Sequence, residues 1–236
     1  MSTLSVTDLA RYERVQNLAR QTLNVIGSRI RPGQNVRGLV ETCRQLMDSL
    51  GATAYWWHGV PALILNGPRL RESMEGDAFQ PSDEPIDADD MVTIDLSPEI
   101  DGYWGDAART FFLRDGVPVG AAQAGAEQAT GMAAQAALHA RLLATTTPEM
   151  TFGELHAQTD AHVAALGFEN LDFLSNYGHS ISRDLHARAF IDAHCHKRLD
   201  SVPLFTFEPH IARPGSAFAF KYEEVYRFEG GRLRLL

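Results

Sequence analysis

The chain has few cysteines, no run of basic residues and no long apolar segment, and each absence excludes a class of protein. Its 236 residues include two cysteines, Cys43 and Cys195, so a disulfide framework is excluded and reduced thiols are expected. The formal net charge is −9, without a basic patch, which argues against nucleic acid as a partner. No apolar stretch reaches the length of a membrane span, so no membrane partner is expected.

The first residues also lack the features of a secretory signal. Residues 1–8 contain neither a basic segment nor an apolar one, which predicts a cytoplasmic protein. The length suits one large domain with a sizeable core, and no linker or low-complexity segment divides the chain. We therefore expect residues 1–236 to form a single domain, without an additional N-terminal domain.

Two aspartates, Asp95 and Asp106, are the most informative residues that are present. Residues 91–97 alternate apolar and polar side chains, which predicts a strand with Asp95 on its polar face. Asp-Gly at 101–102 is a hairpin turn signal, and residues 103–113 form a second strand-like run that carries Asp106. The hairpin brings two carboxylates onto neighbouring strands, where burial is costly unless a cation lies between them. A metal ion is the simplest such cation.

The same segment also fits an ordinary hairpin with exposed acids. Aspartate is common in turns, and neighbours such as Asp87 and Asp101 are expected to have only that role. A calcium loop of the EF-hand type is excluded, because its sixth position counted from Asp95 is Ile100 and not glycine. The choice between these interpretations depends on the rest of the chain.

The second half supplies a histidine and a further acid in comparable settings. His179 follows a glycine, and another histidine, His186, comes seven residues later. Residues 204–209 read Leu-Phe-Thr-Phe-Glu-Pro, a strand-like segment that places Glu208 among aromatic side chains. Isolated acids on strands, together with an imidazole, form the kind of ligand set that binds divalent metal ions.

A last segment, residues 217–228, is expected to form one strand that contains two adjacent acids, Glu223 and Glu224. Neighbouring side chains of a strand point to opposite faces, so only one acid can enter a site shared with the others. Glu223 shares its face with small and polar residues, whereas Glu224 lies among aromatic residues. We therefore expect Glu223 to be the ligand, and Glu224 to lie at an edge or to pair with a basic side chain.

Taken together, these motifs resemble the pita-bread metallopeptidases, the family of methionine aminopeptidase, Xaa-Pro aminopeptidase, prolidase and creatinase. The family pattern is an aspartate, a second aspartate eleven positions later, a Gly-His motif, a Glu-Pro motif and a late glutamate. The chain matches it in order with Asp95, Asp106 (106 − 95 = 11), His179, Glu208 and Glu223. Residues 102–111 are most similar to the Xaa-Pro branch. The resemblance covers nearly the whole chain.

The resemblance implies an α+β fold, the pita-bread fold, with two pseudo-symmetric helix-helix-strand halves and a curved, mainly antiparallel sheet. A faint internal repeat agrees with it, since Pro32 and Pro148 open matching helical patterns (148 − 32 = 116). Asn35 and Thr151 are the expected N-caps of these helices. Longer helices are expected before them, over residues 6–28 and 119–144, and stops at Gly51 and Gly167.

The resemblance also implies the chemistry. The five matching residues would bind two divalent metal ions (manganese, cobalt, iron or zinc), with Asp106 and Glu223 bridging. Glu208 would in addition carry a proton to the leaving amine, and His186 and His58 would hold the carbonyl oxygen or the peptide. The implied protein is a metallo-aminopeptidase, a hydrolase that cleaves the first peptide bond of a small peptide substrate. Xaa-Pro peptides are one candidate class, and a homodimer is left open.

Two serines depart from the family pattern and keep other functions open. The usual Gly-His-Gly-Ile-Gly reads Gly-His-Ser-Ile-Ser here, so Ser180 and Ser182 place side chains where the family has none. A creatinase-like hydrolase is one alternative, although the full ligand set argues against it. A peptide- or protein-binding member of the fold without turnover is the other. Among the remaining histidines, His139 is expected at the surface, and His210 is expected at the rim of the site.

Overall fold

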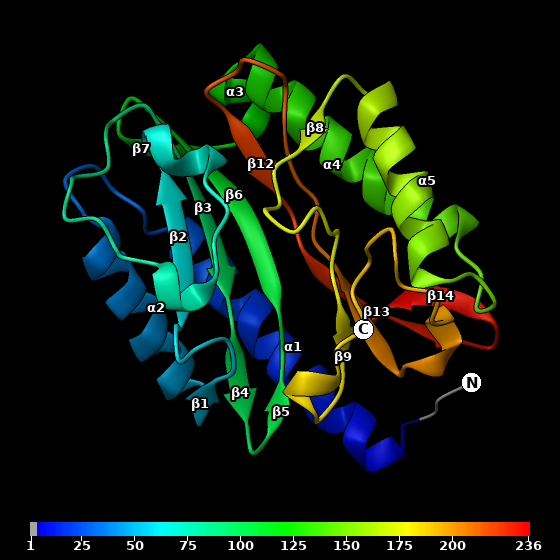
Figure 1. The fold of residues 1–236 in the computed structure, drawn as a ribbon. Helices are drawn as coiled ribbons and strands as arrows, with labels where there is room; N and C mark the ends of the chain where they lie inside the picture. The colour runs from blue at the N-terminus through cyan, green and yellow to red at the C-terminus, as the bar shows by residue number, and fades with distance from the viewer. Residues whose placement is uncertain (1–3) are drawn as a thin grey trace.

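The computed structural model describes residues 4–236, and it contains two halves of similar build (Figure 1). The α-helices are α1 (Val6–Gly27), α2 (Val36–Ser49), α3 (Ala121–Ala124), α4 (Ala126–Thr145) and α5 (Phe152–Ala165). The strands of the first half are β1 (Ala54–Tyr55), β2 (Ala62–Asn66), β3 (Asp90–Leu96), β4 (Pro98–Ile100), β5 (Tyr103–Trp104), β6 (Ala107–Arg114) and β7 (Val117–Val119). Those of the second half are β8 (Glu169–Asn170), β9 (Ser180–Ile181), β10 (Leu204–Phe207), β11 (His210–Ala212), β12 (Ala219–Lys221), β13 (Glu224–Glu229) and β14 (Arg232–Leu235).

Four short 3₁₀ helices complete the described elements. They are η1 (Gly67–Arg71), η2 (Gly76–Ala78), η3 (Leu185–Ala187) and η4 (Leu199–Ser201). The first two lie between β2 and β3. No helix among residues 4–236 is both long enough and apolar enough to cross a membrane.

The predicted helix caps are confirmed. The Asn35 side chain accepts a hydrogen bond from the backbone N–H of Gly38, and the Thr151 hydroxyl accepts one from Glu154 N–H. The Glu154 carboxylate in turn accepts the N–H of Thr151, which completes a capping box. The long helix expected over 119–144 is divided into α3 and α4, because Gly125 between them has φ +154°.

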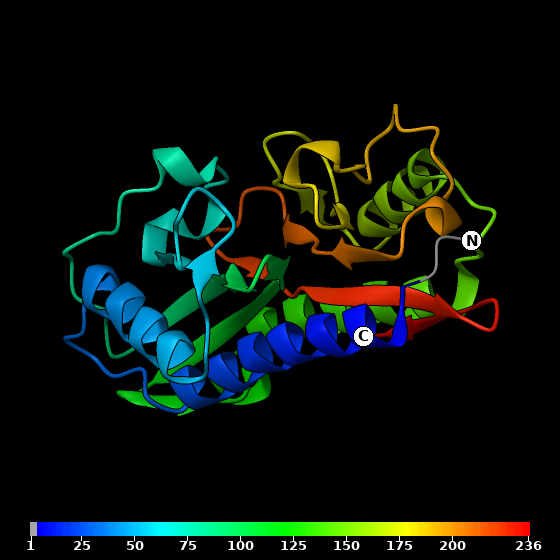
Figure 2. The ribbon, with the colours of Figure 1, turned by 90° about the horizontal axis from the view of Figure 1, so that it is seen from below.

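The strands form two four-stranded sheets and two three-stranded sheets, and every strand pair is antiparallel. The larger sheets have the orders β2-β3-β6-β7 and β14-β13-β10-β9, one in each half. Helices α1 and α2 cover the outer face of the first half's strands (Figure 2). In the smaller sheet β1-β4-β5, Asp101 and Gly102 both have positive φ, as the predicted hairpin turn requires. The expected α+β fold with antiparallel strands is confirmed.

The prediction of a single strand over residues 217–228 is wrong in one respect: the segment is divided into two strands, β12 and β13. At the break, the backbone does not make the hydrogen bonds of a regular β-ladder. Instead, Tyr222 C=O accepts a hydrogen bond from the ring of His139, and Glu223 N–H donates one to Ala108 C=O at 3.0 Å. The chain thereby passes from the sheet of β11 to the sheet of β10. At this crossing it lies beside β6, so the two halves meet where the acidic residues are (Figure 1).

Candidate metal centre

A cavity of about 130 Å³ lies between the two halves, and four of the five predicted ligands line it, all except Glu223. Asp95 and Asp106 reach it from the first half, and His179 and Glu208 reach it from the second. The rest of the lining mixes polar and charged side chains with four aromatic ones, Trp56, Trp57, Phe173 and Phe190.

Asp95 and Asp106 are brought together by the hairpin that the sequence predicts. In the β3–β6 ladder Asp95 lies opposite Ala108, and Asp106 directly precedes β6, two residues before Ala108 in the chain. The backbone at Asp106 is fixed by Gln16 of α1, whose side-chain amide donates to Asp106 C=O at 2.7 Å and accepts Asp106 N–H at 3.0 Å. Because Gln16 binds only the backbone of Asp106, the Asp106 carboxylate is positioned but makes no hydrogen bond to Gln16.

Glu223 is buried with no partner for its charge. Its side chain is fully inaccessible, and neither carboxylate oxygen has a hydrogen-bond partner among the described residues. One oxygen each from Asp95, Glu208 and Glu223 lie within 4.8 Å of one another. A buried, unpaired carboxylate among other carboxylates is strongly unfavourable unless a cation joins the group.

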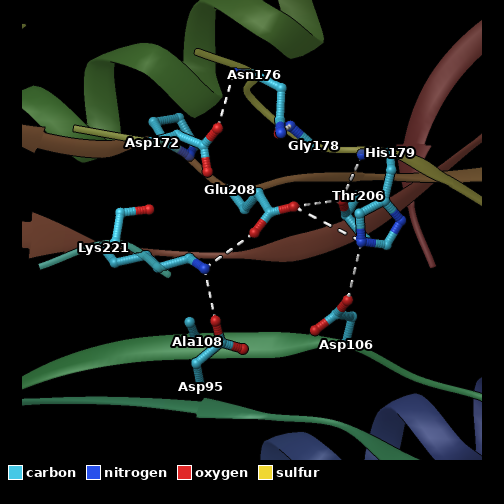
Figure 3. Close-up of polar contacts among 12 residues, drawn as sticks. Asp95, Asp106, Ala108, Asp172, Asn176, Gly178, His179, Thr206, Glu208 and Lys221 are labelled. Atoms are coloured by element: carbon cyan, nitrogen blue, oxygen red, sulfur yellow. Dashed lines mark hydrogen bonds and ion pairs between the residues drawn. The ribbon is translucent and has the colours of Figure 1, made fainter. Parts of the chain in front are cut away.

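His179 directs one ring nitrogen into this group. Its Nδ1 lies 3.2 Å from the carbonyl oxygen of Ser180, which can only accept, so Nδ1 carries the proton and Nε2 keeps its lone pair. Nε2 is 3.4 Å from Asp106 Oδ2 and 3.7 Å from Glu208 Oε1 (Figure 3). A neutral imidazole whose other nitrogen donates to a carbonyl is the usual form of a metal-binding histidine.

The backbone before His179 depends on glycine. Gly178 has φ +139°, and a Cβ at this position would lie 2.4 Å from the carbonyl oxygen of Thr206. The Thr206 hydroxyl accepts the N–H of His179 at 3.0 Å, which ties this segment to β10 next to Glu208. The Gly-His motif therefore places the imidazole by close packing of two backbone segments.

Lys221 is the residue of this centre that the sequence reasoning missed. Its ammonium Nζ donates to Asp95 Oδ2 at 2.5 Å and lies 2.9 Å from Glu208 Oε2 (Figure 3). The available signal was its position two residues before Glu223 on the same strand face, a face interpreted only as polar. The chain contains one other lysine, Lys197.

Burial dominates the ionisation of the acids. It raises the pKa of Asp106 to about 7, an effect that the neighbouring imidazole of His179 opposes. It also raises the pKa of Asp95, against the effect of the Lys221 ammonium, and it raises that of Glu223 well above its usual value, with repulsion from Asp106 adding to the effect. These shifts are the sign of uncompensated negative charge.

Glu208 differs from the other three acids. Burial acts to raise its pKa, but the positive charge of Lys221, aided by the neighbouring ring of His179, outweighs burial and holds the pKa below its usual range. Four carboxylates with one lysine leave an excess of negative charge, and oxygen ligands with one imidazole suit divalent ions such as manganese, iron, cobalt or zinc. The residues present therefore fit a metal centre.

Glu224 points away from the centre and pairs with basic side chains, as expected. Its Oε2 accepts from Nε and Nη2 of Arg20 at 2.9 and 2.7 Å, and its Oε1 accepts from Arg109. The Arg109 guanidinium also stacks over the ring of Tyr222 at 3.9 Å. This buried network joins α1, β6 and β13 and is structural.

The structure does not bring His186 and His58 to the acidic group. His186 lies in η3, which the Asp184 side chain caps, and its side chain is exposed and is not part of the cavity lining. The side chain of His58 is 43% exposed and does not itself line the cavity, although its Nε2 lies 3.5 Å from Glu75, which does. The sequence-based expectation that these histidines hold the carbonyl oxygen or the peptide is not supported by these positions.

His210 lines the cavity instead, beside Glu208. It is buried, and its Nε2 donates to the carbonyl oxygen of Leu70 at 2.9 Å. Burial lowers its pKa to about 4, so the ring is neutral at physiological pH. The expectation that His210 borders the site is confirmed.

Ser180 and Ser182 leave the cavity free. The Ser180 hydroxyl accepts the N–H of Ala189, and the Ser182 hydroxyl donates to Asp184 C=O. Both side chains thus bind the backbone of their own segment, and neither lines the cavity. The two departures from the family pattern do not block the centre.

The fold and this centre define the chain as a metal-dependent hydrolase of the metallo-aminopeptidase class, with the pita-bread fold. It belongs to metallopeptidase family M24, whose profile matches residues 10–229. By sequence it is similar to methionine aminopeptidase B of Synechocystis sp., with 27% identity over 217 residues that cover 88% of this chain and 75% of that protein.

Solved structures share the fold. Prolidase from Pyrococcus furiosus superimposes with a TM-score of 0.80 at 20% identity, covering 99% of this chain and 64% of that one. Methionine aminopeptidase from Thermotoga maritima gives a TM-score of 0.78 at 13% identity, covering 100% and 98%. The chain thus spans less than two thirds of the prolidase. At these identities the similarity concerns the fold, and it does not assign a substrate.

Proposed function

We propose that this chain is a dinuclear-metal aminopeptidase that hydrolyses the first peptide bond of small peptides, with Xaa-Pro peptides as a candidate class. The observation that carries the proposal is the group of four carboxylates and one imidazole at the cavity, in which the fully buried Glu223 has no hydrogen-bond partner among the described residues. Family membership supports a peptidase, whereas the number of ions and the preferred residues are our inference.

The ions would be held by five residues: Asp95, Asp106, His179, Glu208 and Glu223. We assign Asp106 and Glu223 as the bridging ligands. When bound, divalent ions polarise a carbonyl oxygen and lower the pKa of a water molecule toward neutrality. We further propose that residues 1–236 form the catalytic domain and that it works in the cytoplasm, where its two free cysteines would stay reduced.

The chain's own residues supply proton transfer and substrate binding. Glu208, held ionised by Lys221 and His179, takes a proton from the attacking water and gives it to the leaving amine. Other acids on the cavity wall, including Asp172, attract the protonated N-terminal amine of the peptide. Aromatic side chains of the lining, including Trp56 and Phe190, would contact the substrate. His186 could take part only after its segment rearranges, whereas His58 already lies beside Glu75 of the cavity lining.

A panel of small peptides tests the function. Peptides with varied first and second residues, proline included in second place, would be incubated with the protein and Mn²⁺, Co²⁺, Fe²⁺ or Zn²⁺, and products would be separated by chromatography. We expect release of the first residue, no cleavage after N-acetylation of the peptide, and loss of activity with a chelator. Cleavage of internal bonds would contradict an aminopeptidase.

The same panel separates the alternatives. A binding member of the fold would bind peptides, measured by calorimetry, without releasing a residue under any metal. A creatinase-like hydrolase would cleave a non-peptide C–N substrate and leave the panel intact. We rank both below the aminopeptidase, because the complete acidic group is present and the cavity above it is open to substrate.

A further inference from the structure

The Lys221 ammonium occupies one end of the acidic group. It bridges Asp95 Oδ2 (2.5 Å) and Glu208 Oε2 (2.9 Å), and all three side chains are less than a fifth exposed (Figure 3). Asp95 has no other cationic partner among the ion pairs of residues 4–236. The lysine therefore neutralises a carboxylate that would otherwise be free to bind a metal ion.

The main chain holds Lys221 in this place, so only a movement of its side chain can separate the ammonium from Asp95. Its N–H donates to the Thr110 hydroxyl and its C=O accepts from the same hydroxyl, both at 3.0 Å. On the other side it pairs with His210 in the β11–β12 ladder. The backbone is thus fixed between two strands, and the four-carbon stem alone can withdraw the ammonium from Asp95.

The opposite end of the group has no such cation. There His179 Nε2 faces Asp106 Oδ2 and Glu208 Oε1, the oxygen of Glu208 that Lys221 does not contact. The two Glu223 oxygens have no hydrogen-bond partner among the described residues, and one of them lies within 4.8 Å of oxygens of Asp95 and Glu208, so Glu223 belongs to neither end alone. The two ends thus differ before any ion binds: one offers open ligands, and the other is already occupied by a positive charge.

We propose that Lys221 makes the two metal positions unequal: an ion at the His179 end binds without competition, whereas an ion at the Asp95 end must displace the Lys221 ammonium. Lys221 acts as a resident counter-ion for Asp95 and sets the metal concentration at which the second position fills. This inference rests on the proposed function only in so far as the centre binds divalent ions, and it does not require turnover.

Metal titration tests it. Mn²⁺ binding to the metal-free protein would be followed by calorimetry, and bound manganese would be counted by mass spectrometry after gel filtration. We expect two phases in the wild type. Lys221→Met keeps the length of the stem without its charge, and it should tighten the second phase by about tenfold or more while leaving the first unchanged. Lys197→Met, at the exposed second lysine, is the matched control and should change neither phase.

Lys221→Arg separates charge from shape. The arginine keeps a cation at the same position, so the second phase of Mn²⁺ binding should stay weak. If Lys221 had only a structural role, Lys221→Met and Lys221→Arg would both change the two phases of Mn²⁺ binding together. The proposal is overturned if the wild type binds two Mn²⁺ ions with equal affinity, or if Lys221→Met leaves the second phase where it was.

A second readout needs no variant. Reductive methylation of wild-type protein, followed by peptide mass spectrometry, reports on Lys221 with Lys197 as an internal reference. We expect Lys221 to react more slowly than Lys197 in metal-free protein, and to gain reactivity over the second phase of the titration only. An unchanged Lys221 reactivity through that phase contradicts displacement.

The two proposals fail separately. If the protein binds Mn²⁺ in two unequal phases that depend on Lys221 but cleaves no peptide, the proposed function is wrong and this inference stands. If peptides are cleaved while both ions bind equally, the inference is wrong and the function stands.

Discussion

His179 and Asp106 come from opposite halves of the chain, and His179 Nε2 lies 3.4 Å from Asp106 Oδ2. The separation is too long for a strong hydrogen bond, and it suits two groups that share a third partner. Because each half supplies part of the group, an ion bound here would link the halves. Metal binding and the stability of the whole fold are therefore coupled.

Glu208→Gln tests the proton-transfer role. The substitution keeps the size of the side chain but removes a charge and the proton acceptor, so turnover should fall by about 10²–10⁴-fold while the fold is retained. The measurement is kcat on a cleaved peptide together with circular dichroism. Glu229→Gln, on the exposed end of β13, is the control and should behave as the wild type. A Glu208→Gln protein with nearly normal kcat would refute the mechanism.

The adjacent acids should separate metal binding from stability. Glu223→Ala should lose bound metal, because it removes the unpartnered carboxylate of the centre. Glu224→Ala should keep its metal but lower the free energy of unfolding by about 3 kcal/mol, since Arg20 and Arg109 lose their buried partner. Metal content and denaturant unfolding would be measured on both. Loss of metal in the second variant alone would reverse the assignment.

Part of the candidate centre could be predicted from local sequence patterns, whereas the full set of five ligands came from the resemblance to the metallopeptidase family. The alternation around Asp95, the Asp-Gly turn and the strand face of Glu223 each follow from the two-residue period of a strand. The helix caps at Asn35 and Thr151 follow from side chains that satisfy free N–H groups. These signals act over a few residues and need no tertiary contact.

The remainder depends on contacts between distant segments. Lys221 was visible only as a polar residue on the right face, and its distance from Asp95 is set by how β12 meets β6. His139 was expected at the surface, yet it is buried and bridges Tyr226 and the break after β12. A polar helix pattern could not reveal this, because the partners lie more than 80 residues away.

Asp106 should make a contribution to the stability of the metal-free protein that falls with rising pH. Folding raises the pKa of Asp106 from 3.8 to about 7, so between these values the folded state binds more protons than the unfolded state. The stabilisation from the protonated acid is complete below about pH 4 and is lost as pH passes 7. His139 and His210, whose pKa values burial lowers to about 4, act in the opposite direction over the same range, so the effect of Asp106 is measured against a variant. In metal-free protein, the Tm of the wild type relative to that of Asp106→Asn should be lower at pH 8 than at pH 5.5. A relative Tm that stays constant or rises over this range would contradict the assignment.

His186→Ala tests whether the exposed histidine acts in turnover. If it donated to the carbonyl oxygen in the reaction, its removal would cost about 10²–10³-fold in kcat. The side chain lies outside the cavity, so we expect kcat within about threefold of the wild type. His210→Gln, which alters a buried residue of the cavity wall, should reduce kcat more than His186→Ala does. A hundredfold loss in His186→Ala with unchanged Tm would show that the segment from Ser182 to Arg188 moves onto the substrate during the reaction.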